Sequence, residues 1–174
     1  MAEILSAAGV KSGSLYYFFK SKEALLLAVL DRYVELLQPA VIEPAFARTR
    51  DPIGRIFAVL DGYRRMLLET GFKQGCPIGN LALEMSDKSE AVREKIALNF
   101  DNWTGAVRQC LLDADDALAA DVDRDRLATF VLTVMEGAVM VARIRRSIAP
   151  YEQAIAILRT YFERIASTTC TLDK

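Results

Sequence analysis

The chain has 174 residues, a formal net charge of −1 at pH 7, and 52% hydrophobic and 26% charged residues, a balance that excludes an intrinsically disordered protein. It has no histidine and no CxxC pair, so a zinc site is not expected. We find no GxSxG, Walker or Rossmann glycine pattern, and the sequence therefore predicts no enzyme, no catalytic residues, no metal and no cofactor.

The front of the chain predicts two short helices joined by a tight turn. Residues 2–8 carry apolar side chains at helical spacing, and Gly9 can end that helix in a left-handed conformation. Ser12 is the predicted N-cap of a second helix over roughly residues 13–19. The side chains predicted to face inward from this second helix are Leu15, Phe18 and Phe19. This is the order of a helix-turn-helix, whose second helix enters the major groove of DNA.

The charges are distributed in agreement with that interpretation. Residues 1–22 contain three lysines and one glutamate, so the front carries +2 and the remainder carries −3. Neutralising phosphates supplies much of the affinity of proteins for DNA, so nucleic acid is expected at this end. Ser21 can cap the next helix, whose free N–H groups could share one phosphate with Lys22. From spacing and charge alone, a solvated amphipathic hairpin with ordinary surface lysines remains the alternative.

A longer motif resembles a known family. The pattern Gly9-Val10-x-x-Gly13-Ser14-Leu15-Tyr16-Tyr17-x-Phe19-Lys20-Ser21-Lys22-Glu23-x-Leu25 is similar to the helix-turn-helix signature of the tetracycline-repressor (TetR/AcrR) transcription regulators. The segment 75–84 is similar to one found in the lincomycin-resistance-regulator-like subgroup. The resemblance implies a regulator, commonly a repressor, that a small-molecule inducer releases from its palindromic DNA operator. It places DNA contacts at Lys11, Ser12, Gly13, Ser14, Tyr16, Tyr17 and Lys22.

The chain departs from the family pattern at two points. Phe18 stands where the family often has a histidine, and Met1 stands at the start of the family's second helix. We therefore expect a truncated, homeodomain-like head that lacks the usual first helix, either because a longer native chain has been shortened, which we favour, or because the head is loosely folded. This chain alone is expected to bind DNA more weakly than it would with a native upstream segment. The alternative function is a ligand-binding helical dimer with impaired or no DNA binding.

The middle of the chain predicts four further helices. The first extends from residue 22 to about residue 46 and is kinked or shortened by Pro39 and Pro44. The next three are predicted from an Asp51-Pro52 start signal, from Pro77, and from a capping box formed by Asp87 and Glu90. The acidic stretch 113–125 is predicted to be a polar connection. We expect an all-α fold with a DNA-binding head over residues 1–47 and a ligand-binding and dimerisation bundle over 48–174.

The last two predicted helices indicate how the protein assembles. Residues 127–144 are apolar nearly all the way round, so this helix must be covered on every side. Its central Glu136 and terminal arginines argue against a membrane span. We expect one face to pack in the chain's own core and the other on a second subunit, as a C2 homodimer able to read palindromic DNA; the core of a helical monomer is the alternative. The predicted interface residues are Leu127, Val131, Val134, Ala138, Val141, Ala142, Tyr151, Ile155, Leu158 and Phe162.

The resemblance also implies an inducer site among the helices of the bundle. The residues predicted to line it are Phe57, Tyr63, Met66, Asn99, Trp103, Phe130, Met135 and Glu136. Aromatic and methionine side chains at such positions are equally explained as plain core. Cys76 is expected to be structural rather than reactive, because no basic neighbour is closer in sequence than Lys73. Three widely spaced cysteines and the lack of a signal-peptide pattern predict a cytoplasmic protein.

Overall fold

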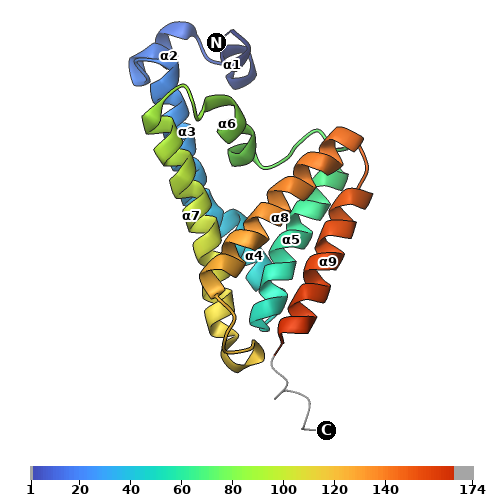
Figure 1. The fold of residues 1–174 in the computed structure, drawn as a ribbon. Coiled ribbons are helices and arrows are strands. Elements are labelled where there is room, and N and C mark those ends of the chain that lie inside the picture. Colours follow the sequence, from blue (N-terminus) through green and yellow to red (C-terminus); the bar gives the residue numbers. More distant parts are fainter. Residues whose placement is uncertain (1, 167–174) are drawn as a thin grey trace.

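The computed structural model describes residues 2–166, which are helical apart from loops and one isolated β-bridge (Figure 1). The prediction of an all-α fold is confirmed. The helices are α1 (Ala2–Ala8), α2 (Ser12–Phe18), α3 (Lys22–Leu36), a π-helical segment (Leu37–Ile42), α4 (Glu43–Phe46), α5 (Pro52–Glu69), α6 (Pro77–Met85), α7 (Glu90–Asp113), a short 3-10 helix (Asp115–Ala117), α8 (Arg124–Arg145) and α9 (Ala149–Ile165).

The body is organised around α8. This helix packs against α7, α9 and α5, and α3 packs along α7. The two short helices α1 and α2 lie together at one end of the molecule, where α3 begins (Figure 1). The head is therefore joined to the body through α3.

Most predicted helix starts are confirmed, and two caps are corrected. Asp51 caps α5 by accepting a hydrogen bond from Gly54 N–H at 2.6 Å, and Pro77 opens α6 as predicted. The cap of α7 is Ser89, whose Oγ accepts from Val92 N–H at 3.3 Å, because Asp87 lies two residues too early to reach that turn. The predicted Ser12 cap is also wrong, since α2 already begins at Ser12 and the preceding lysine makes no side-chain cap.

The helix predicted from residue 22 to about residue 46 changes character near its prolines. It is α-helical to Leu36, continues as the π-helical segment 37–42, and finishes as the short α4. In the π turn, Glu43 N–H donates to the Gln38 carbonyl five residues back. Pro39 has no N–H to donate within a regular helix, and such a wider turn absorbs the interruption without ending the helix. We call α3, the π segment and α4 together the linking helix.

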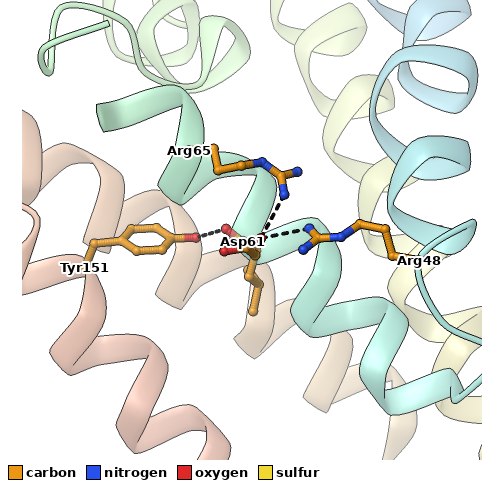
Figure 2. Close-up of polar contacts among 5 residues, drawn as sticks. Arg48, Asp61, Arg65 and Tyr151 are labelled. Atoms are coloured by element: carbon orange, nitrogen blue, oxygen red, sulfur yellow. Dashed lines mark hydrogen bonds and ion pairs between the residues drawn. The ribbon is translucent and has the colours of Figure 1, made fainter. Parts of the chain in front are cut away.

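The far end of the linking helix is fastened to the body (Figure 2). Arg48, just after α4, contacts Asp61 of α5 at 2.7 Å, and Arg65 contacts the same carboxylate at 2.9 Å. One residue earlier in α5, the Leu60 carbonyl accepts a hydrogen bond from the buried Tyr151 hydroxyl of α9 at 2.7 Å. Partly exposed ion pairs contribute little stability individually, but this cluster fixes the end of the linking helix relative to α5 and α9.

Within the described residues, α8 is the one helix that is long and apolar enough to cross a membrane by length and composition. It packs against three other helices of this chain, as the central helix of a folded bundle does.

Candidate functional site

The first two helices have the geometry of a helix-turn-helix. Gly9 has φ +64°, and its N–H donates to the Ser6 carbonyl at 3.3 Å, while Val10 N–H reaches Leu5 O at 3.1 Å. These bonds end α1 in the left-handed conformation that glycine adopts without strain, as the sequence predicts. After α2, the Ser21 Oγ accepts from Ala24 N–H at 3.0 Å, which confirms the predicted cap of the next helix.

All the predicted DNA-contact residues lie on the surface of the head. Leu15 of α2 and Phe19, which follows this helix directly, are half-buried. They are four residues apart, so they lie on the same face, and this is the face that α2 turns inward. Tyr17 is 74% exposed. The other exposed members of the predicted set are Lys11, Ser12, Gly13, Ser14, Tyr16 and Lys22.

Phe18 corrects one expectation about the head. It was predicted to face inward, but it is 73% exposed because Leu15 and Phe19 already occupy the inner stripe. Its ring meets that of Tyr17 edge-on, with centroids 5.1 Å apart. Lys20 Nζ lies 5.9 Å from the Tyr17 ring centroid and donates to the Tyr17 carbonyl at 3.3 Å. The C-terminal end of α2 therefore presents two aromatic rings in edge-to-face contact beside an ammonium group.

Polar contacts along α3 join the head to α7. Ser89, the cap of α7, donates a hydrogen bond to Glu23 in the first turn of α3. Six residues further along the chain, in α7, Lys95 pairs with Asp31 at 2.7 Å. The buried Asn99 side chain then donates to the Leu30 carbonyl at 3.2 Å. Displacement of α7 or α3 would break contacts that hold the head in place.

A cavity of about 200 Å³ lies where the linking helix crosses the body. Five of the eight predicted ligand-site residues line it, namely Tyr63, Asn99, Trp103, Met135 and Glu136. The linking helix provides a wall of the cavity that the sequence does not predict. That wall consists of Tyr33, Leu36, Leu37, Ala40 and Val41, of which the last three belong to the π segment. An aromatic side chain in the apolar stripe of that helix, Tyr33, was the one available signal.

The other three predicted ligand-site residues lie elsewhere. Phe57 is buried in the core against Phe162, with ring centroids 5.4 Å apart. Met66 lines a separate groove between α4 and α5. Phe130 is exposed and meets Tyr161 of α9 at 6.1 Å. Helical periodicity groups residues by face but cannot say which face closes a cavity, and this explains why these three residues lie outside it.

The cavity contains polar atoms that the chain leaves without partners. Glu136 Oε1 and Trp103 Nε1 are buried and make no hydrogen bond within the described residues. The backbone of α6 approaches this carboxyl so closely at Gly79 that any Cβ there would overlap Glu136 Oε2. Burial raises the pKa of the Glu136 carboxyl above its ordinary value, and the neighbouring Cys76 thiol opposes that shift in part.

Cys76 has a structural role, as the sequence predicts. Its Sγ caps α6 by accepting from Gly79 N–H at 3.5 Å, and the residue is buried. Burial, reinforced by the Glu136 carboxylate, raises the pKa of the Cys76 thiol to about 12. The thiol is therefore protonated and unreactive at neutral pH. Burial likewise raises the pKa of the Tyr63 hydroxyl, so this group is also protonated at neutral pH.

Replacing Glu136 by glutamine is expected to stabilise the fold in a pH-dependent way. The folded-state pKa of the carboxyl is raised, so the fold binds its proton more tightly and loses stability as the pH rises through that value. Glu136→Gln keeps the shape of the protonated acid at every pH. Its melting temperature should exceed that of the unaltered protein by about 2–4 °C at pH 8, the shift for about 1 kcal/mol in a chain of this size. The difference should shrink towards zero at pH 4, and a constant difference would contradict the burial of this charge.

Comparison with known proteins identifies the family. Residues 52–158 match the family described as tetracyclin repressor-like, C-terminal domain, and residues 1–29 match the bacterial regulatory proteins of the tetR family. The HTH-type transcriptional repressor DhaR of Mycobacterium sp. (strain GP1) is 30% identical over 169 residues, covering 96% of this chain and 82% of that protein. The chain belongs to the TetR family.

Solved structures of TetR-family proteins have the same fold. The regulatory protein TetR from Rhodobacter sphaeroides matches with a TM-score of 0.83 and 28% identity, over 95% of this chain and 86% of the other. A TetR transcriptional regulator from Chloroflexus aurantiacus J-10-FL matches with a TM-score of 0.81 and 32% identity, over 95% and 84%. This chain is accordingly a DNA-binding transcriptional regulator, with its helix-turn-helix in the head and a helical C-terminal domain.

Most of the predicted interface residues lie inside the core of this TetR-family chain. Seven of the ten predicted interface residues are buried in the chain's own core, where they pack α8 against α5, α7 and α9 and offer no surface to a partner. These are Leu127, Val131, Ala138, Ala142, Tyr151, Leu158 and Phe162. Val134 and Ile155 are half-buried, and Val141 is exposed. The apolar side chains exposed on α8 and α9 are instead Phe130, Met140, Val141, Ile144, Ile157 and Tyr161.

Proposed function

We propose that this regulator is a repressor that binds a palindromic operator as a C2 homodimer and leaves it when a small molecule occupies the cavity. The observation that carries the proposal is the linking helix. Its N-terminal end follows the DNA-reading helix α2, and its Tyr33 and the π segment 37–42 form a wall of the cavity. A ligand that binds more tightly when this helix is in a second position shifts the population of molecules towards that position, and the head moves with the helix. The size of the population shift is set by the difference between the ligand's binding free energies to the two states.

The DNA contacts are proposed on α2 and at the start of α3. Lys11, Ser12, Gly13, Ser14, Tyr16 and Tyr17 share the exposed surface of the head, where Ser14 and the tyrosines offer hydrogen-bonding groups to base edges. Lys22 follows the Ser21 cap, so its ammonium and the free N–H groups of α3 can hold one phosphate. The division that follows from this is a head over residues 1–47 and a ligand-binding and dimerisation part over 48–174.

The dimer is proposed to form through the exposed apolar side chains of α8 and α9. Ile144 and Ile157 are 82% and 72% exposed, and the exposed rings of Phe130 and Tyr161 contact each other across the two helices. Exposed apolar side chains this numerous on two neighbouring helices mark a protein-binding surface rather than a solvated one. Two copies of the helix pair related by a two-fold axis give a four-helix interface, to which Val134, Val141 and Ile155 of the predicted set also contribute.

Three further assignments rest on the family and on the sequence. We propose a cytoplasmic protein that acts without a cofactor and without enzymatic activity. We also propose that it belongs to the lincomycin-resistance-regulator-like subgroup. The support for the subgroup is the segment 75–84, whose Gly79 allows α6 to approach Glu136 and whose Cys76 caps that helix.

The test is a titration of a palindromic promoter fragment by fluorescence anisotropy at several salt concentrations. Phosphate contacts from two heads predict a steep loss of affinity with salt, at least about tenfold between 50 and 200 mM. A scrambled fragment should bind more weakly at every concentration. Binding that ignores both salt and sequence would instead support the alternative, a ligand-binding helical dimer that does not read DNA.

A further inference from the structure

The cavity at the linking helix has one charge and no counter-charge. Among the side chains that line it, Glu136 is the only acid and there is no lysine or arginine. Arg143, seven residues further along α8, is engaged elsewhere, with Asn80 Oδ1 at 2.7 Å and the Lys73 carbonyl at 3.3 Å. Glu136 is half-buried, and its Oε1 is buried without a partner among the described residues. Such a carboxylate oxygen is unfavourable, so a cation that entered this cavity would gain a contact that the lining does not supply.

The rest of the cavity wall suits a cation that carries apolar groups. Four aromatic rings contribute to it, from Tyr33, Tyr63, Phe100 and Trp103, and the aliphatic side chains of the linking helix and α8 complete it. Aromatic walls attract organic cations through the negative faces of their rings, most strongly where water is excluded. Trp103 Nε1, which is buried without a partner, can donate to a polar atom of the bound molecule. A volume of about 200 Å³ admits a molecule somewhat larger than benzene.

Glu136 lies at the boundary between this cavity and a neighbouring groove. Glu136 also borders an open groove between α6 and α8, together with Cys76, Phe100 and Leu132, which line both spaces. The close approach of α6 at Gly79 holds the carboxyl at this junction, since no side chain separates them. Arg143 lines the same groove, where its guanidinium contacts Asn80 and the Lys73 carbonyl, and Glu136 is the one acid of the described residues that borders both spaces.

We propose that the ligand of this cavity is a small organic cation, an amine in its protonated or quaternary form, whose charge pairs with Glu136 and whose apolar part lies among the four rings. This inference rests on the proposed function for the site's regulatory role, and it adds the chemical class of the effector. An anion is repelled by Glu136, and a neutral molecule of the same shape leaves the carboxylate without its counter-charge.

The binding test compares benzylammonium with benzyl alcohol, which has the same number of non-hydrogen atoms and no charge. Trp103 is the only tryptophan of the chain and lines the cavity, so its fluorescence reports occupancy directly. At pH 7 benzylammonium should bind at least about tenfold more tightly than benzyl alcohol. Glu136→Gln should remove that preference, whereas Glu84→Gln, which alters an exposed carboxylate of α6, should keep it.

Two further measurements guard against ambiguous results. Thermal melting verifies that Glu136→Gln is folded, and Tyr33→Leu should weaken benzylammonium more than benzyl alcohol. The proposal is overturned if benzyl alcohol binds as tightly, if Glu136→Gln changes nothing, or if neither probe alters Trp103 emission. Operator release is followed separately by anisotropy. If benzylammonium binds through Glu136 without releasing DNA, the ligand class stands and the proposed repressor mechanism fails. If benzyl alcohol binds best and releases DNA, the repressor mechanism stands and the ligand class fails.

Discussion

Replacing both Ile144 and Ile157 by aspartate is expected to convert the dimer into monomers and to lower operator affinity by at least about a hundredfold. These two side chains are the most exposed apolar groups of α8 and α9. An interface that buries them would have to bury four unpaired carboxylates in the doubly substituted dimer. A single head then loses the gain in affinity that two linked heads obtain on a two-fold operator.

The same substitutions should leave the fold of each chain intact, because both side chains point away from its core. Sedimentation at micromolar concentration should show a twofold fall in mass, and the melting curve of the separated chains should remain cooperative. Leu83→Asp is the matched control, since Leu83 is 80% exposed but lies on α6. A double variant that stays dimeric would place the interface elsewhere.

A third variant separates this surface from the interface that the sequence predicts. Val131 is fully buried between α8 and its neighbours, so Val131→Ala should lower the melting temperature through lost packing. It should not change the dimer dissociation constant beyond what that loss of stability explains. The opposite pattern would restore Val131 to the interface.

Helical periodicity and capping residues were enough to predict where the helices lie in the sequence. They were not enough to predict which face of each helix packs in the core. Asp51, Pro77 and Ser21 mark helix starts by local chemistry, and the structure begins helices there. In α8, by contrast, nearly every position is apolar, so spacing alone fits any inward face. The buried stripe includes Val131, Met135 and Ala142, and only the packing against α5, α7 and α9 selects it.

The cavity shows a second limit of sequence reasoning. Glu136 and Gly79 are 57 positions apart, and no periodic pattern connects them. Their contact depends on how α6 approaches α8, and Glu136 Oε1 has no partner among the described residues because Arg143 turns towards Asn80. The wall formed by the π segment could not be predicted from the sequence either. Pro39 predicts that the regular helix is interrupted, but it does not say whether the helix ends there or continues through a wider turn.

Two substitutions in the head are expected to weaken DNA binding strongly, each for a different physical reason. Tyr17→Ala removes an exposed ring and hydroxyl proposed to meet base edges, and should lower operator affinity about 5- to 150-fold for each half-site. Lys22→Ala removes a proposed phosphate contact. It should weaken operator and scrambled DNA alike, and reduce the slope of log affinity against log salt by about 2 for a dimer, because each lost phosphate contact contributes about 0.9.

The contrast between these two variants tests the orientation of α2 more sharply than either variant alone. Tyr17→Ala should reduce discrimination between operator and scrambled DNA while keeping the salt slope, because the tyrosine carries no charge. Anisotropy titrations over a salt series measure both quantities, and Leu83→Ala supplies an exposed apolar control outside the head. If Tyr17→Ala binds operator normally, α2 meets the groove through another face, and the exposed rings of Tyr17 and Phe18 then need a different explanation.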